Sequence, residues 1–292
     1  MNKTKLCTIL VGAIGAMITS AQAVHTLGYD FDFLATGPLA EGASIANTGS
    51  VGGPGTFHLG GGTGTVVNTG TVLGTAYGTV NLGNTLTLTP AADNNQNLGA
   101  PNIDANAAVS LFGITPGTAY TAFAWVNMAS NAGDNMIFGG NGDAPSPNGQ
   151  VLHHGTRNGN VHSGHWGDDL GPDQAVNIGV ANGQWHVLAF TNDGPGGTQT
   201  IYLDPGTGSE VTATGAGGAG GGMQTAINLL IGTANNGGSF NGQMDRVTTY
   251  AEVRTPAQIA AAATAAPVPE PTAFVAVASG AAMLLGLRRR RS

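Results

Sequence analysis

Residues 183–193 read Gly-Gln-Trp-His-Val-Leu-Ala-Phe-Thr-Asn-Asp, and residues 198–206 read Thr-Gln-Thr-Ile-Tyr-Leu-Asp-Pro-Gly. Both runs are rich in β-branched and aromatic residues and a short Gly/Pro cluster separates them, a pattern typical of an antiparallel hairpin. Alternation places Trp185 on one face of the first strand and Leu188 with Phe190 on the other. Because both faces carry large apolar groups, we expect a strand between two packed layers, and the sequence predicts a β-sandwich.

Three further blocks accompany this hairpin in a recognisable order. Residues 120–126 read Tyr-Thr-Ala-Phe-Ala-Trp-Val, residues 228–232 read Asn-Leu-Leu-Ile-Gly, and residues 240–250 read Phe-Asn-Gly-Gln-Met-Asp-Arg-Val-Thr-Thr-Tyr. With the hairpin, they resemble the laminin-G-like, concanavalin-A-like jelly-roll family over roughly residues 109–260. The resemblance implies an all-β fold, a two-sheet antiparallel jelly-roll β-sandwich. Related sandwiches include glycan hydrolases as well as binding modules.

The N-terminal residues 1–23 have the pattern of a Sec signal peptide. Lys3 and Lys5 precede an apolar run, and Ala21 and Ala23 form the small-x-small pattern that signal peptidase cleaves. We therefore predict export. Cys7 is the only cysteine and lies in this leader, so the exported chain has neither a disulfide nor a cysteine-ligated metal site.

The C-terminal residues 267–292 combine a proline motif, an uncharged segment and an arginine cluster. The uncharged segment, 272–287, is short for a membrane-spanning helix, and the arginines would hold its end in the cytoplasm. A permanent tail anchor is one interpretation. The order of the parts more closely resembles the PEP-CTERM sorting signal of Gram-negative bacteria, which implies transient inner-membrane anchoring and removal of the tail by an exosortase-type protease. The residues of this motif are Pro269, Glu270, Pro271, Arg288, Arg289, Arg290 and Arg291.

The segment between these ends, residues 24–266, is predicted to form one β-sandwich domain. Residues 36–100 are rich in Gly and Thr, and we expect short strands there, such as residues 85–89. Near the end, Thr255 followed by Pro256, with Gln258 three residues after the threonine, is typical of a capped helix start. This helix, running to Ala266, is the only one expected in the exported chain.

The charge of the exported chain argues against nucleic acid as a partner. Without the leader and the tail, the only basic residues are Arg157, Arg246 and Arg254, whereas 15 of the 16 acidic residues remain. A surface with so few cations lacks the basic patch that neutralises phosphates. The remaining polar surface is mostly Asn, Thr, Ser, Gln and Gly, side chains and backbone groups that can hydrogen-bond to hydroxyl-rich polymers.

Four of the seven histidines fall within residues 153–165, in a predicted second hairpin with a type I′ turn at Asn158-Gly159. Two functional interpretations and one structural interpretation of this segment remain open. A metal site would combine His154, His162 or His165 with Asp168 or Asp169 on Zn²⁺ or Ca²⁺. A carbohydrate site would use Trp166 as a stacking platform. Its hydrogen-bonding groups would be Arg157, His165, Asp168 and Asp169.

The structural interpretation, which we favour over a transition metal, is that the strand histidines line a half-buried face. Asp168 and Asp169 would then supply turn hydrogen bonds. The family resemblance separately implies a weak candidate calcium site on loops, for which Asp134, Asp143 and Asp193, with Asp204, are the candidate ligands.

An enzymatic function is not expected from the carboxylates. Glycoside hydrolysis needs two carboxylates that flank the scissile bond. The chain after the leader has four glutamates, Glu41, Glu210, Glu252 and Glu270, and none lies in a paired pattern on one strand. We therefore predict an exported, non-catalytic jelly-roll module at the cell surface or in the extracellular matrix that binds polysaccharide. The alternatives are a glycan-active hydrolase and a purely structural matrix or adhesion protein.

Overall fold

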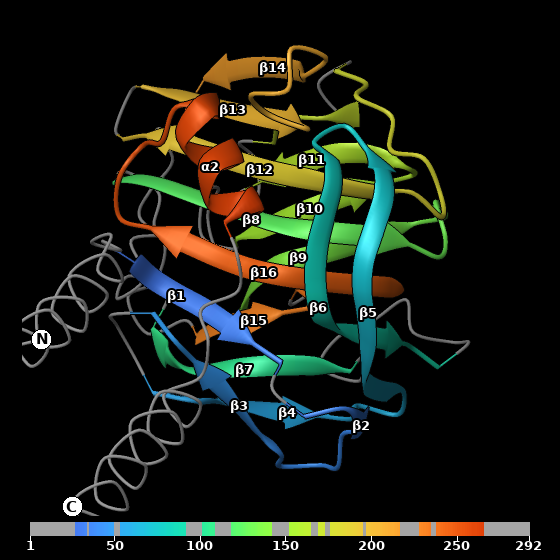
Figure 1. The fold of residues 1–292 in the computed structure, drawn as a ribbon. Helices are drawn as coiled ribbons and strands as arrows, with labels where there is room; N and C mark the ends of the chain where they lie inside the picture. Colours follow the sequence, from blue (N-terminus) through green and yellow to red (C-terminus); the bar gives the residue numbers. More distant parts are fainter. Residues whose placement is uncertain are drawn as a thin grey trace, which may run out of the picture.

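The computed structural model describes residues 27–33, 35–49, 53–91, 101–108, 118–141, 152–164, 169–172, 176–194, 197–216, 228–234 and 238–265. Within these ranges the protein consists of antiparallel strands in two packed layers and one short helix (Figure 1). The predicted jelly-roll β-sandwich is therefore confirmed. The boundaries predicted for the domain, residues 24 and 266, stay a prediction.

The first sheet contains the strand of Trp185 at its centre. In spatial order its strands are β1 (Leu27–Asp32), β16 (Gly242–Tyr250), β8 (Ala119–Met128), β12 (Trp185–Asp193), β13 (Thr198–Leu203) and β14 (Val211–Ala216). A hairpin of β5 (Thr63–Thr75) and β6 (Gly78–Thr89), which carries β2 (Gly37–Pro38), joins this sheet where β6 pairs with β16.

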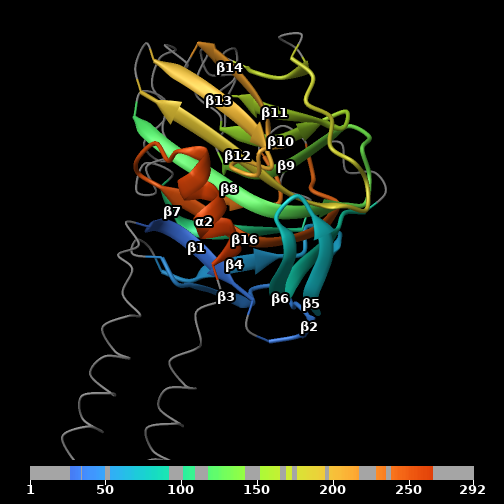
Figure 2. The same cartoon turned by 45° about the horizontal axis from the view of Figure 1, so that its top comes forward.

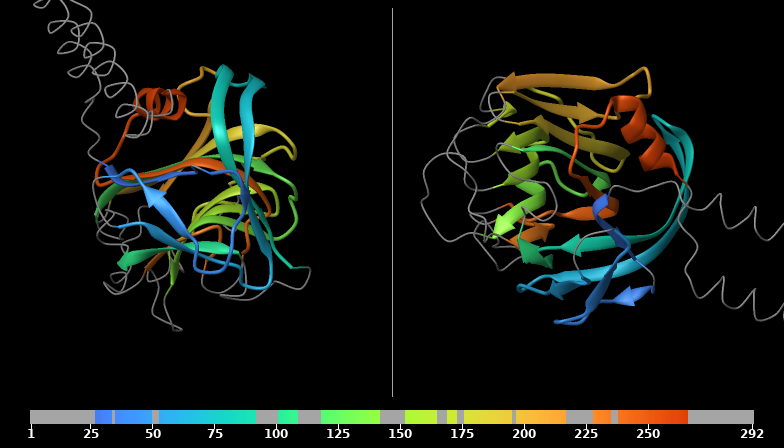
Figure 3. Two further views of the ribbon diagram at one scale, coloured as in Figure 1. Left: turned by 60° about the horizontal axis from the view of Figure 1, so that its bottom comes forward. Right: turned by 90° about the vertical axis from the view of Figure 1, so that its left-hand side faces the viewer.

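The second sheet packs behind the first (Figures 2 and 3). Its strands are β11 (Asn160–Gly164), β10 (His153–Arg157), β9 (Asp134–Asn141), β15 (Asn228–Ile231), β7 (Asn102–Ala108), β4 (Gly55–His58) and β3 (Ser44–Asn47). Strand β1 pairs with β16 of the first sheet and with β3 of the second. The two layers are therefore joined along one side.

The two faces of β12 pack into two separate cores, as its alternation predicts. Leu188 and Phe190 point into the main core between the sheets. Val187 and Ala189 belong to a smaller core on the outer face of the first sheet, with Trp125 at its centre. Helix α2 and the β5–β6 hairpin cover this outer core (Figure 1).

Strands β5 and β6 are much longer than the short strands expected for residues 36–100. They span 13 and 12 residues, and the distal half of the hairpin crosses the strands of the first sheet (Figure 1). Register shifts near Gly70 and Gly83 change which face of the hairpin is turned toward the rest of the protein. Leu86, nearer the base, therefore reaches the main core, whereas Val80 and Leu82 pack into the outer core.

Helix α2 (Pro256–Thr264) begins as predicted and ends two residues earlier. Thr255 and Gln258 make the two reciprocal hydrogen bonds of a capping box, each side chain accepting from the backbone N–H of the other residue. The buried indole N–H of Trp125 donates a 2.7 Å hydrogen bond to the Ala263 carbonyl oxygen, which fixes the helix on the sheet.

Among the described residues, no helix has the length and apolar character needed to cross a membrane. The predicted signal peptide, the segment 272–287 and the sorting motif all lie outside the described residues. The predictions on both ends of the chain therefore stay predictions.

Candidate functional site

A groove opens on the first sheet where three strands of distant sequence come together. Thr87 of β6 pairs with Gln243 of β16, Gln243 pairs with Asn127 of β8, and Asn127 pairs with Trp185 of β12. Directly paired residues of a sheet point to the same face. These four side chains therefore form a row on the outer face, opposite to the main core.

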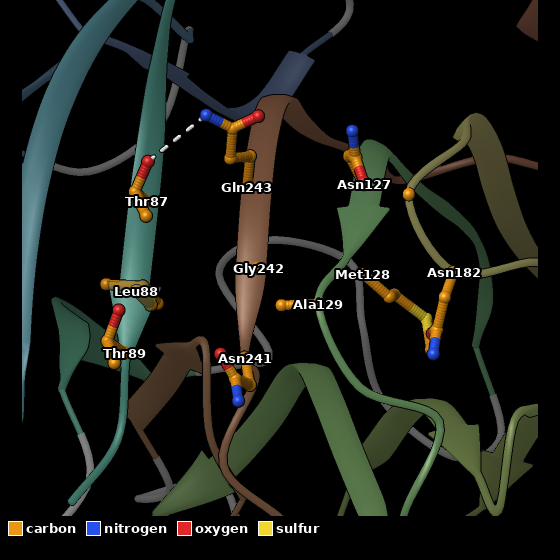
Figure 4. A pocket seen from close by; sticks show the side chains of 11 residues that line it. Thr87, Leu88, Thr89, Asn127, Met128, Ala129, Asn182, Asn241, Gly242 and Gln243 are labelled. Carbon is orange, nitrogen blue, oxygen red and sulfur yellow. Dashed lines mark hydrogen bonds between the residues drawn. The ribbon is translucent and has the colours of Figure 1, made fainter.

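The groove has a cavity volume of about 480 Å³, and its lining combines amide and hydroxyl side chains with the apolar side chains of Leu88, Met128 and Ala129 (Figure 4). Gln243 Nε2 donates a 3.4 Å hydrogen bond to Thr87 Oγ1. In the described part of the chain, the side-chain amides of Asn127, Asn182 and Asn241 make no hydrogen bond. These groups offer both donors and acceptors to a ligand.

Gly242 permits the close approach of strands on which this row depends. A Cβ atom at this position would lie 2.3 Å from the Asn127 carbonyl oxygen, and the glycine has a φ of +148°. Any side chain would therefore push the start of β16 away from β8. The neighbouring Gln243 would then leave its position beside Asn127.

Trp185 ends the row on the β12 side. Its side chain is half-buried and packs in part against the outer core, so a portion of the indole stays accessible beside the amides. The adjoining turn contributes Asn182 and Gly183 to the groove. None of the described residues that line the groove carries a carboxylate.

The histidine hairpin has the predicted turn and the predicted alternation. Asn158 and Gly159 both have positive φ, 49° and 76°, as a type I′ turn requires. The register pairs Gly155 with His162, which places His153, Arg157 and His162 on the outer face of the second sheet.

His154 faces the opposite way, into the core, so its assignment as a metal ligand is wrong. The His154 ring stacks on Phe190 with centroids 4.8 Å apart. Its Nε2 lies 2.8 Å from the Tyr120 hydroxyl and its Nδ1 lies 3.2 Å from Ser163 Oγ. Both ring nitrogens are therefore engaged by protein groups.

On the outer face, His153, His162 and Asp169 form what we call the histidine cluster. One potential ligand atom from each of the three lies within 4.8 Å of the others. His153 Nε2 is 3.2 Å from Asp169 Oδ1, and the rings of His153 and His162 stack with centroids 5.0 Å apart. Of the predicted metal set, His162 and Asp169 are thus brought together, with His153 in place of His154.

Arg157 supports the histidine cluster from one side. Its guanidinium makes a bidentate ion pair with Asp134, at 2.9 and 3.2 Å, and its Nη1 lies 3.8 Å from Asp169 Oδ2. Bidentate pairing fixes the plane of the guanidinium. Arg157, predicted as a carbohydrate ligand, is therefore occupied largely by its two carboxylate partners.

Burial dominates the electrostatics of the histidine cluster. Burial, together with the charges of His153 and Arg157, lowers the pKa of His162 to about 3, and the opposing effect of Asp169 is smaller. Burial alone would raise the pKa of Asp169. The hydrogen bond with His153 and the nearby positive charges outweigh that effect, so this pKa is held below its ordinary value. At neutral pH, His162 is neutral and Asp169 is ionised.

The calcium prediction stays a prediction. Asp134 is paired with Arg157, and Asp193 accepts a hydrogen bond from the backbone N–H of Thr198. Asp204 accepts one from the N–H of Val187 and lies 2.7 Å from His186 Nδ1. The other predicted members of the two sites, Asp143, His165, Trp166 and Asp168, lie outside the described residues.

A laminin G family model, described as the concanavalin A-like lectin/glucanases superfamily, matches residues 97–260. The chain belongs to this superfamily. No curated protein sequence matches the chain.

Several solved structures are similar to this chain at low sequence identity. Domain 4 of AbnA, an extracellular arabinanase from Geobacillus stearothermophilus in complex with arabinotriose, is 18% identical with a TM-score of 0.52, and the match covers 79% of this chain and 100% of that domain. A heptameric SAP-like pentraxin from Limulus polyphemus is 12% identical with a TM-score of 0.44, covering 63% and 83%. The CBM40 of a Ruminococcus gnavus IT-sialidase, bound to sialyllactose, is 12% identical with a TM-score of 0.38, covering 51% and 84%.

Proposed function

We propose that this superfamily member is an exported, non-catalytic module that binds polysaccharide in the groove of Thr87, Gln243 and Asn127. The observation that carries the proposal is the row itself. It places hydroxyl and amide groups side by side across three strands and ends at the partly accessible indole of Trp185. Sugar rings present alternating hydroxyl groups and an apolar face, which such a mixture matches.

The state of the groove's polar groups supports this assignment. The side-chain amides of Asn127, Asn182 and Asn241 have no hydrogen-bond partner among the described residues, and all three residues line a space open to solvent. Their hydrogen-bonding capacity is therefore available to a hydroxyl-rich ligand without breaking protein contacts. The volume of about 480 Å³ is within the range of small-ligand sites.

The absence of carboxylates among the groove's described lining residues supports a non-catalytic role. Hydrolysis of a glycosidic bond requires an acid and a second carboxylate, about 5 to 9.5 Å apart across the sugar. Hydroxyl and amide groups can hold a glycan, but they do not replace that pair.

Export and sorting are part of the proposal on the strength of the two ends of the sequence. The leader with Ala21 and Ala23 fits Sec-dependent export, and the C-terminal motif resembles a PEP-CTERM signal. The proposed route passes through an inner-membrane intermediate to the cell surface or the extracellular matrix. Intact mass of the protein recovered outside the cell tests it, because a species that retains Arg288 would contradict removal of the tail.

The binding proposal is tested by affinity electrophoresis of the full chain against arabinan, xylan and β-glucan. The double variant Asn127→Ala with Gln243→Ala removes two ligand hydrogen bonds, each of about 0.5–1.5 kcal/mol, so affinity should fall about 5- to 150-fold. A matched control is the double variant Thr212→Ala with Thr214→Ala on exposed positions of β14.

The outcomes of this experiment are distinct. Retarded migration of wild type and control, but not of the groove variant, supports the assignment. Equal retardation of all three places the binding elsewhere. Release of reducing ends from any of the polysaccharides would contradict the non-catalytic role.

A further inference from the structure

The imidazole of His162 lies outside the groove and makes no hydrogen bond to any described residue. The side chain is fully buried, and neither ring nitrogen has a hydrogen-bond partner among the residues that the structure describes. Buried polar groups are normally paired, because an unpaired one loses its hydration without compensation. His154, one strand away, shows the ordinary arrangement, with a partner at each nitrogen. The described protein groups therefore leave the hydrogen-bonding capacity of the His162 ring unused.

The surroundings of His162 have the composition of a metal site. Two imidazoles and one carboxylate converge, with one ligand atom of each within 4.8 Å of the others. Donor atoms bonded to zinc at about 2.0–2.1 Å in a tetrahedron lie about 3.3 Å apart. The distance of 3.2 Å between His153 Nε2 and Asp169 Oδ1 already matches this spacing. With the three atoms within 4.8 Å of one another, the remaining distances need to shorten by at most about 1.5 Å to reach this spacing.

The charges around the cluster favour a cation. The carboxylates of Asp134 and Asp169 lie here against the single guanidinium of Arg157. Arg157 contacts the Asp169 oxygen that is not bonded to His153. Such outer contacts orient a ligating carboxylate.

Gly164 leaves the space in which two of the ligands meet. A Cβ atom there would lie 2.0 Å from His153 Nε2 and 2.4 Å from Asp169 Oδ1. Only a glycine at this position lets both groups approach the sheet. The convergence of the imidazole and the carboxylate is therefore built into the backbone of β11.

We propose that His153, His162 and Asp169 bind one divalent transition-metal ion of the zinc type. Two imidazole nitrogens and one carboxylate oxygen suit zinc better than calcium, which prefers six to eight oxygen ligands. Three protein ligands leave one coordination position for water. The ion connects Asp169, in the segment after β11, to the strands β10 and β11. The proposal is independent of glycan binding in the groove on the other sheet.

The test is a titration of the metal-free full chain, purified without a histidine tag, with Zn²⁺ by calorimetry and with Co²⁺ by visible absorption. We expect one equivalent of each ion and the absorption bands of tetrahedral Co²⁺. His162→Leu and Asp169→Asn should each weaken binding at least about 100-fold. Ca²⁺ in excess should not displace Co²⁺.

The control is His58→Ala, which removes a histidine that is paired with Glu41 on the surface. It should bind as wild type does. Wild-type protein that takes up no stoichiometric Zn²⁺ overturns the proposal, and so does a His162→Leu variant that binds Zn²⁺ with unchanged affinity. Circular dichroism shows whether the two ligand variants are folded. If His162→Leu does not fold, the zinc affinity of Asp169→Asn tests the proposal.

Discussion

Replacing His162 by leucine should stabilise the protein when no metal is present. The imidazole is fully buried, and within the described part of the chain its one donor and one acceptor both lack hydrogen-bond partners. An unsatisfied buried polar group costs about 1–3 kcal/mol. Leucine has a similar volume and no polar atom, so the exchange should raise the free energy of unfolding by about 1–3 kcal/mol. For a domain of this size each kcal/mol corresponds to about 2–4 °C in Tm.

The assay is guanidinium unfolding of wild type and variant in the presence of a chelator, with the free energy obtained by linear extrapolation. His154→Leu is the matched control, because the same change one strand away removes a ring with two partners. In this variant the buried Tyr120 hydroxyl loses its hydrogen bond with His154, so the free energy of unfolding should fall by about 1–3 kcal/mol. A His162→Leu variant that is less stable than wild type in chelator would refute the reasoning, since the ring would then contribute favourable contacts of its own.

Three further substitutions test the fold around the groove and the outer core. Thr255→Ala removes the helix cap and should lower the free energy of unfolding by about 1 kcal/mol, measured by thermal denaturation. Gly242→Ala forces a Cβ against the Asn127 carbonyl oxygen; it should lower Tm and weaken polysaccharide binding together, and unchanged values of both would disprove the close approach. Tyr77→Phe removes the 2.8 Å hydrogen bond from the tyrosine hydroxyl to the Pro205 carbonyl oxygen, so urea unfolding should show a loss of about 0.5–1.5 kcal/mol while binding in the groove is retained.

Features that depend on neighbouring residues in the sequence were predictable. The two faces of β12 follow from the alternation of residues in one strand. The positive φ of Asn158 and Gly159 follows from the preference of that dipeptide for a type I′ turn. The capping box of α2 follows from three residues near Thr255. Each of these depends on local stereochemistry alone.

The groove was not predictable, because its row joins residues that are far apart in the chain. Thr87, Asn127 and Gln243 meet only through the register of three strands, and polar residues on separate strands carry no local mark of that register. The alternation of residues indicated the face of the strand on which Trp185 lies, but it did not indicate which residues of other strands lie beside it. The choice of His154 over His153 failed for a related reason. Alternation separates the two faces of a strand, but it does not say which face covers the core.

The position of β16 makes completion of the sandwich a late event in synthesis. Residues 242–250 insert between β1 and β8 and also pair with β6, so three earlier strands lack a neighbour until this segment has been translated. Pairing β1 with β16 closes a loop of about 200 residues, and contacts of such sequence separation form slowly. A nascent chain that ends before residue 242 therefore lacks the strand that joins β1, β6 and β8, and the first sheet is complete only after residue 250 has been translated.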